Sequence, residues 1–200
     1  MSQNETLEYY NKNAESFVYE TLNVNLQETQ ERFLKHIPPH RRVLDFGCGS
    51  GRDAKYFYTK GFKVDAVDGS DELCKRAAEY TGINVKKMLF SDLDVVEEYD
   101  GIWACSSILH LSSLELRDVL LKMIKALKNG GVIYASFKYG EYEGMRNGRY
   151  FTDFTETSFK SYIANIDNVE IADSWITGDV RPGRGDQKWL NLILQKSNIH

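Results

Sequence analysis

The stretch from Val43 to Asp53 constrains the fold of this chain more than any other segment. It reads Val-Leu-Asp-Phe-Gly-Cys-Gly-Ser-Gly-Arg-Asp, so three apolar residues and an acid lead into three alternating glycines. A helical pattern follows at once, which predicts a strand, a tight turn and a helix start. Because glycine lacks a Cβ and a helix start offers unpaired N–H groups, such a turn favours the close approach of a partly anionic ligand.

The spacing of the glycines separates two kinds of nucleotide-binding turn. A dinucleotide-binding turn reads G-x-G-x-x-G, with an acid about 20 residues further on. Here Gly47, Gly49 and Gly51 are spaced more tightly by one residue. Asp68 ends the next apolar run, so an α/β sheet brings its carboxylate beside the glycines, where it can accept both hydroxyls of a ribose. The alternative is a turn between a strand and a helix that binds no ligand.

The segment 43–51 resembles the first motif of the class I S-adenosylmethionine-dependent methyltransferases, a pair of Val, Ile or Leu residues followed by Asp-x-Gly-x-Gly-x-Gly. The resemblance extends from Leu44 to Leu194 and is weakest past residue 138. Within this superfamily the sequence is most similar to small bacterial methyltransferases of the tellurite-resistance type. The resemblance implies S-adenosyl-L-methionine as methyl donor, S-adenosyl-L-homocysteine as product, and in-line transfer of the methyl group to a small molecule.

The apolar runs predict one α/β domain, and the resemblance implies a Rossmann-like, seven-stranded sheet that is mostly parallel, has an antiparallel last strand and is flanked by helices. Residues 1–40 are expected to form an N-terminal helical cap and residues 41–200 the core. The cap helices are expected at 6–22 and 26–36, and a long polar loop is expected over 138–151. The strands are expected at 42–46, 62–67, 85–90, 99–105, 132–137, 169–177 and 189–195. Core helices are expected at 52–60, 112–128 and 155–166. A further core helix is expected to begin at Ser70 and to bury Leu73, Ala77 and Tyr80.

Composition excludes several other classes of protein. The chain has 200 residues and a formal net charge of −4 with no long basic run, which argues against a large nucleic-acid interface. Cys48, Cys74 and Cys105 form no C-x-x-C pair, so we expect neither a metal site nor a disulfide framework, and the cytoplasm as the compartment. With no signal peptide and no apolar stretch of membrane-spanning length, no membrane partner is expected. The sequence leaves a monomer and a homodimer open.

The resemblance also implies which residues hold the cofactor. Asp45 and the glycines would meet the methionine end, Asp68 the ribose, and Asp92 the adenine, although Asp92 could instead cap a turn. Arg52 is expected to pair with the methionine carboxylate or to lie along its helix surface. The complete set of expected cofactor contacts is Asp45, Gly47, Cys48, Gly49, Gly51, Arg52, Asp68, Gly69, Ser70, Asp92, Leu93, Cys105 and Ile108.

The substrate side is expected to contain a proton-transfer group and several cations. His110, which titrates near neutrality, could act as a base or be a structural histidine bonded to backbone. Since methyl transfer from a sulfonium depends mainly on positioning, no single residue need be obligatory. The cations could converge on an anionic small molecule or lie exposed in solvent. The expected catalytic residues are His110, Tyr10 and Lys138, and the expected substrate contacts are Tyr9, Tyr139, Arg149, Arg181 and Arg184.

Two other functions remain open at this stage. An NAD-dependent oxidoreductase shares the α/β sheet, but the glycine spacing and the expected terminal hairpin count against it. A methyltransferase-fold module that binds without turnover is disfavoured by the intact acids Asp45, Asp68 and Asp92. No Asn-Pro-Pro-Tyr motif follows the fourth strand, where Cys105-Ser106-Ser107-Ile108 stands instead. That departs from the enzymes that methylate DNA bases or protein glutamine.

Overall fold

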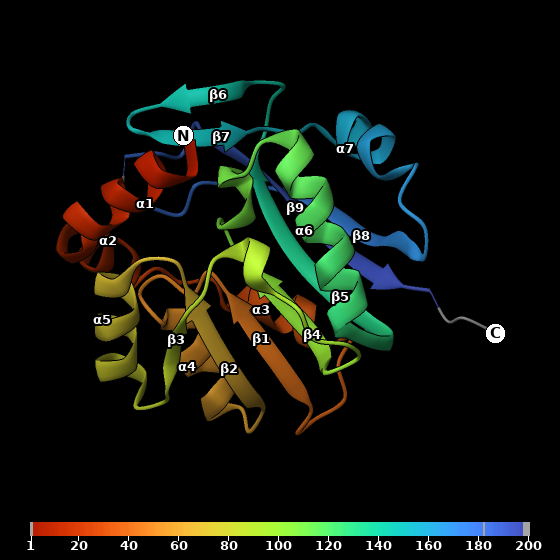
Figure 1. Ribbon diagram of the computed structural model, residues 1–200, viewed down its shortest axis with the longest axis horizontal. Coiled ribbons are helices and arrows are strands. Elements are labelled where there is room, and N and C mark those ends of the chain that lie inside the picture. The colour runs from red at the N-terminus through yellow and green to blue at the C-terminus, as the bar shows by residue number, and fades with distance from the viewer. Residues whose placement is uncertain (1, 182, 198–200) are drawn as a thin grey trace.

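A seven-stranded sheet runs through the molecule, with its strands in the order β3-β2-β1-β4-β5-β9-β8 (Figure 1). The computed structural model describes residues 2–181 and 183–197. Strand β9 is antiparallel to both of its neighbours, and the other neighbouring pairs are parallel, which confirms the predicted sheet. The strands are β1 (Arg42–Phe46), β2 (Lys63–Asp68), β3 (Val85–Lys87), β4 (Tyr99–Ala104), β5 (Leu127–Lys138), β8 (Val169–Gly178) and β9 (Lys188–Lys196).

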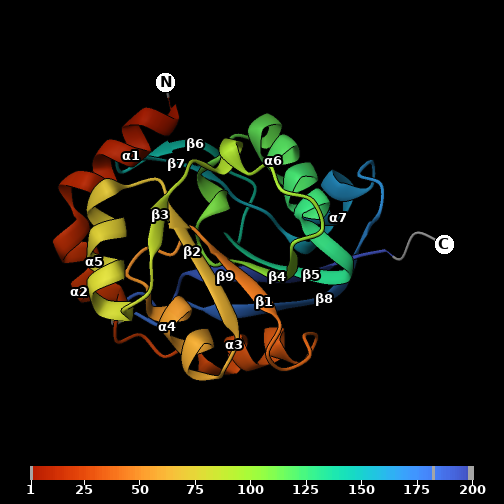
Figure 2. The same cartoon turned by 60° about the horizontal axis from the view of Figure 1, so that its bottom comes forward.

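Helices cover both faces of this sheet. Helices α3 (Gln27–Leu34), α4 (Arg52–Thr59) and α5 (Asp71–Thr81) pack on one face, and α6 (Ser113–Ala126) and α7 (Glu156–Ile163) on the other (Figure 2). Phe33 and Phe57 enclose the indole of Trp103 between the first helices and the sheet, with ring centroids 5.2 Å from it. Because both faces are covered, the central strands are buried almost throughout. The predicted burial of Tyr80 is wrong, since 43% of it is exposed.

Several element boundaries differ from the predicted ones. The predicted helix 6–22 is two helices, α1 (Ser2–Lys12) and α2 (Ala14–Thr21), separated at Asn13, whose side chain donates to the Tyr9 carbonyl. An asparagine that bonds nearby backbone competes with helical geometry, which accounts for the break. The predicted strand 85–90 ends at Lys87, and Phe90–Asp92 form a 3₁₀ turn. The helix predicted to end at residue 128 ends at Ala126, and the chain enters β5 directly.

A hairpin replaces the loop that we predicted after β5. Strands β6 (Glu143–Arg146) and β7 (Arg149–Thr152) pair antiparallel around Asn147 and Gly148, whose φ values are 53° and 76°. Positive φ at both central residues is typical of the type I′ turn that Asn-Gly favours. The hairpin lies above the carboxyl edge of the sheet, beside α1 (Figure 1), and Thr6 Oγ1 accepts a hydrogen bond from the Tyr150 N–H at 3.1 Å.

Candidate active site

A cavity of about 1090 Å³ opens at the carboxyl edge of the sheet. Its floor is formed by residues 47–50 of the glycine loop (residues 47–51) with the ends of β2, β4 and β5. Its remaining sides are lined by α1, α2, the segment 24–31, the β6–β7 hairpin and the β8–β9 loop. Helices α1 and α2, called the cap helices from here on, lie close to this floor, since a Cβ added at Gly49 would lie 3.0 Å from the Phe17 ring. A cavity of this size exceeds what one drug-sized ligand fills, so it has room for a cofactor and a small second molecule.

Asp68 holds the glycine loop and also faces the cavity. Its Oδ2 accepts the Gly49 N–H and its Oδ1 accepts the Ser70 N–H, each at 2.9 Å. Burial raises the pKa of Asp68, and these N–H groups oppose that rise. Each oxygen retains a second lone pair for a hydroxyl donor. Gly49, Gly69 and Asp68 all line the cavity, as do Gly47 and Cys48.

The Arg52 guanidinium pairs with Asp53, which was not among the predicted cofactor contacts. Its Nε and Nη2 donate to the two carboxylate oxygens of Asp53, both at 2.8 Å, and Nη1 donates to the Thr21 carbonyl. Asp53 also accepts from Gln30 at 2.6 Å and from the Trp103 indole at 2.9 Å. Burial alone would raise the pKa of Asp53, but the Arg52 charge and the hydrogen bonds from Arg52, Trp103 and Gln30 together outweigh burial and lower that pKa. An acid in a first helical turn usually faces solvent, so nothing in the sequence indicated this buried network.

Three predicted cofactor contacts support the loop from behind and do not line the cavity. Asp45 is 2% exposed, and its Oδ2 has no hydrogen-bond partner in the described part of the chain. Burial raises the pKa of Asp45 well above its ordinary value, and the Asp53 charge adds to this. Ser70 caps α5 by accepting the Leu73 N–H, and it donates to Asn11. Gly51 packs against Ala77.

Three further residues that were expected to contact the cofactor, Asp92, Leu93 and Ile108, lie outside the cavity. The Asp92 side chain is exposed, and its Oδ2 accepts the Leu89 N–H at 3.3 Å, which is the turn-capping alternative. The 3₁₀ turn at residues 90–92 directs this carboxylate outward. Leu93 and Ile108 are buried in the core beneath α6. None of the three lines the cavity, whose boundary here is Met88, Leu89 and Phe90.

Tyr10 and His110 form a hydrogen-bonded pair in the cavity wall, 2.7 Å apart at the Tyr10 hydroxyl and Nε2. The other ring nitrogen, Nδ1, lies 2.6 Å from the Tyr150 carbonyl, which can only accept, so Nδ1 carries the proton. Nε2 therefore accepts, and the Tyr10 hydroxyl donates to it. Burial lowers the pKa of His110 to about 4, so the ring is neutral near pH 7. Burial raises the pKa of Tyr10, and the nearby charge of Arg149 opposes that rise.

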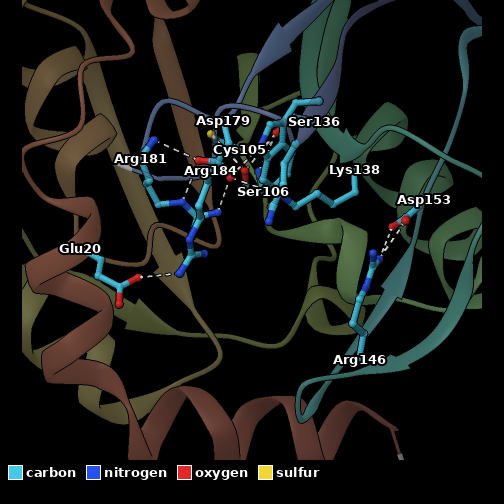
Figure 3. Close-up of polar contacts among 12 residues, drawn as sticks. Glu20, Cys105, Ser106, Ser136, Lys138, Arg146, Asp153, Asp179, Arg181 and Arg184 are labelled. Atoms are coloured by element: carbon cyan, nitrogen blue, oxygen red, sulfur yellow. Dashed lines mark hydrogen bonds and ion pairs between the residues drawn. The ribbon is translucent and has the colours of Figure 1, made fainter.

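Five cations line one side of the cavity and form the basic wall (Lys138, Arg146, Arg149, Arg181 and Arg184). Figure 3 shows four of them, from the end of β5, the hairpin and the β8–β9 loop, around one open space. Lys138 and Arg181 both pair with the buried Asp179, at 3.3 and 2.6 Å. Arg146 pairs with Asp153 at 2.7 Å and Arg184 with Glu20 at 3.4 Å.

Arg149 differs from the rest of the basic wall. Its guanidinium carbon lies 4.5 Å from the Tyr9 ring centre and 5.3 Å from that of Phe151. Within the described residues no carboxylate lies within ion-pair distance of Arg149, and its buried Nε has no hydrogen-bond partner. Tyr9 supports this guanidinium and does not itself line the cavity, whereas Tyr139 lines the cavity and is 37% exposed.

The structure adds polar and aromatic groups that the sequence analysis did not identify. Ser136 Oγ accepts the Ser106 N–H at 2.8 Å at the cavity floor, beside Cys105, whose pKa burial raises to about 12. Tyr134 and Trp189 also line the cavity. Tyr134 and Ser136 lie in the second half of β5 and Trp189 at the start of β9, and both strands read in the sequence as core strands. No described group of three or more His, Cys, Asp or Glu residues could hold a metal, and no described helix has the length and apolar character to cross a bilayer.

Comparison with known proteins gives consistent matches to one family. Residues 43–131 match the methyltransferase domain family. An uncharacterized methyltransferase of Staphylococcus carnosus is 25% identical over 138 residues, which are 64% of this chain and 67% of that protein. The malonyl-[acyl-carrier protein] O-methyltransferase of Salmonella typhimurium is 28% identical over 95 residues, 46% of this chain and 36% of that protein. The chain thus spans only about a third of the length of some curated relatives that it matches.

The fold matches that of a solved methyltransferase over nearly the whole chain. The Burkholderia thailandensis 1,6-didemethyltoxoflavin-N1-methyltransferase, solved with 1,6-didemethyltoxoflavin and S-adenosylhomocysteine, has a TM-score of 0.79 and 21% identity. The match covers 96% of this chain and 87% of that one. Residues 43–131 thus match the methyltransferase domain family, and the glycine loop, the strand order and the fold match make the chain similar to the class I S-adenosyl-L-methionine-dependent methyltransferases, whose cofactor is S-adenosyl-L-methionine.

Proposed function

We propose that this protein transfers a methyl group from S-adenosyl-L-methionine to a small-molecule acceptor. The observation that carries the proposal is the position of the Asp68 carboxylate. The Gly49 N–H holds it beside the glycine loop, and it faces a cavity of about 1090 Å³. A cavity of this size, closed over by the cap helices, favours a small acceptor over a folded protein or a duplex. The terminal antiparallel strand β9 favours methyl transfer over the nicotinamide-dependent alternative.

The residues present fit the cofactor. Asp68 would accept the ribose hydroxyls, and the glycine loop would lie against the methionine portion, with Cys105 near the methyl group. The unpartnered Oδ2 of Asp45 lies behind this loop, so it would act on the cofactor through the loop. Bound here, the cofactor supplies a methyl group on an electron-poor sulfonium, which needs in-line approach of the acceptor and exclusion of water.

Tyr10 and His110 would remove the acceptor's proton. The only proton of the Tyr10 hydroxyl is donated to His110, so the Tyr10 oxygen presents lone pairs to an acceptor X–H group. When X takes the methyl group that the bound cofactor would supply, the X–H proton would pass to the Tyr10 oxygen. The Tyr10 proton passes to Nε2 of His110, which becomes an imidazolium. The positive charge of the sulfonium is thus replaced by one on His110.

A labelling experiment tests this proposal. Protein is incubated with methyl-labelled S-adenosyl-L-methionine and a deproteinised small-molecule extract, and low-mass labelled products are counted. We expect transfer by the wild-type protein, slowed about 100-fold in Tyr10→Phe because general-base help of this kind is worth about 10²–10⁴ in rate. Tyr19→Phe is the matched control, since Tyr19 lies on α2 and is 86% exposed.

One outcome would contradict the proposed methyl transfer, and a second would contradict only the proton-transfer role of Tyr10 and His110. Binding of S-adenosyl-L-methionine with no label transferred to any low-mass product would favour a binding module without turnover. Equal rates for Tyr10→Phe and wild type would remove Tyr10 and His110 from proton transfer while leaving methyl transfer in place.

A further inference from the structure

The basic wall carries more positive charge than its acids neutralise, and one of its cations, Arg149, has no acid partner among the described residues. Asp179 serves two cations, Lys138 and Arg181, and the Arg181 hydrogen bonds help to lower its pKa against the effect of burial. The charge of Arg146 is met by Asp153, and that of Arg184 by Glu20. These contacts within the described chain offer partners to every cation of the basic wall except Arg149. Lys188 also lines the cavity without an acid partner, but it is exposed.

Packing fixes the Arg149 guanidinium in one orientation. Ring faces of Tyr9 and Phe151, from α1 and β7, lie 4.5 and 5.3 Å from its central carbon, and Tyr10 lies at 5.9 Å. A guanidinium stacked on aromatic rings retains its planar edge for hydrogen bonds, and that edge matches a carboxylate in bidentate geometry. A cation that is ordered before binding also loses little conformational entropy when it binds.

Arg149 lies within a small molecule's length of the Tyr10 and His110 pair. Its charge opposes the effect of burial on the pKa of Tyr10, and it is one of the groups that lower the pKa of His110. Resting on the methyl-transfer function proposed above, we propose that the acceptor is an organic acid whose carboxylate binds Arg149 while its X–H group faces the Tyr10 oxygen. The carboxylate anchors the acceptor, and a different atom, X, receives the methyl group.

This proposal refines the anionic substrate expected from the sequence. Lys138, Arg181 and Arg184 are less suited as anchors because each already pairs with an acid, although Lys138 and Arg181 share the single charge of Asp179. The anchor belongs to the β6–β7 hairpin, which the sequence analysis treated as a loop.

Calorimetry on the complex with S-adenosyl-L-homocysteine tests the assignment. The probes are 4-hydroxybenzoate, 3-hydroxybutyrate and indole-3-acetate, each beside the amide that differs only in lacking the charge. We expect the wild-type complex to bind at least one acid about tenfold or more tightly than its amide, since a charge-assisted bidentate pair is worth that much. The preference should vanish in Arg149→Gln, return in part in Arg149→Lys, and persist in Arg117→Gln, which removes an equal charge from α6.

The outcomes separate this proposal from the proposed function. If the wild-type complex prefers none of the acids to its amide, or if Arg149→Gln retains the preference, the anchor assignment is overturned. In either case the binding of S-adenosyl-L-homocysteine, measured first on each variant, stays intact. Loss of that binding in the wild-type protein would instead overturn the methyltransferase function itself.

Discussion

At the scale of single residues, two acids that look alike in the sequence have opposite positions in the structure. Asp68 follows β2 and is 9% exposed, with both oxygens bonded to backbone N–H groups. Asp92 follows β3 and lies exposed on a 3₁₀ turn. The sequence placed both at the carboxyl edge of the sheet, but it could not show that β3 would end early and turn Asp92 outward.

This difference predicts that Asp92 contributes little to cofactor binding. Asp92→Asn is expected to change the affinity for S-adenosyl-L-homocysteine by less than about twofold. Solvent screens the charge of an exposed carboxylate that lies outside the cavity, so Asp92 interacts only weakly with a bound ligand. Isothermal calorimetry on the variant and the wild type checks this. A loss of about tenfold or more would mean that the turn at residues 90–92 rearranges on binding and brings Asp92 to the adenine.

His110 predicts a pH dependence of stability. Its pKa is lowered from 6.5 to about 4, so between these values the unfolded chain binds more protons than the folded protein. Stability is therefore lost as the pH falls from about 6.5 towards 4, by about 2–3 kcal/mol at pH 4.5. Urea unfolding at pH 7.5 and 4.5 should show this extra loss in the wild type and not in His110→Gln.

Comparing the wild-type protein with His110→Gln isolates the contribution of His110 to the pH dependence of stability. The raised pKa values of Asp45 and Asp68 act in the opposite sense, because the folded protein keeps those protons longer, but both acids are present in both proteins. An equal loss of stability in wild type and variant would show that His110 is not held neutral.

At the scale of elements, the β6–β7 hairpin joins the cap to the basic wall. Gly148 has a φ of 76°, and a Cβ there would lie 3.2 Å from the Tyr9 ring. Gly148→Ala therefore adds both backbone strain and a close contact with Tyr9 of α1. We expect a loss of about 1 kcal/mol in stability together with faster amide exchange in α1.

Gly82→Ala is the matched control for that substitution. Gly82 has a φ of 74° with nothing within 4 Å of an added Cβ, so it carries the strain without the contact. The Gly82→Ala variant should lose a similar amount of stability and leave amide exchange in α1 unchanged. Equal exchange in both variants would mean that the hairpin does not hold α1.

Most of the elements could be predicted because the signals were local. Apolar runs marked the strands, Gly61 marked the end of α4, and the glycine loop with Asp68 gave the cofactor edge, whereas Asn129–Gly131, a typical helix-end signal, lie inside β5. The hairpin also had a local signal, Asn147-Gly148, which we did not use. The pairing of Asp53 with Gln30 and Trp103 had none, because it depends on three segments meeting in space.

At the scale of the whole molecule, the cap helices lie over the glycine loop and line the cavity, so we expect a bound ligand to hold them in place. A Cβ added at Gly69 would lie 2.6 Å from Leu7, and Ser70 Oγ donates to Asn11, which shows how closely α1 meets this loop. Ligand binding should therefore slow amide exchange across residues 4–21 and leave α6 unchanged. Hydrogen-exchange mass spectrometry with and without S-adenosyl-L-homocysteine measures this. Uniform protection of all elements would contradict a closing cap.

The most direct test of the central claim is calorimetric titration of the protein with S-adenosyl-L-homocysteine, in parallel with NAD. The account predicts micromolar binding of the adenosyl ligand, no binding of NAD, and a loss of about tenfold or more in Asp68→Asn, since hydrogen bonds to a charged group are worth that much. Asp71→Asn, an acid on the same turn whose side chain is 66% exposed, should bind as the wild type does. Failure of the wild-type protein to bind S-adenosyl-L-homocysteine, or equal affinity in Asp68→Asn, would contradict the account.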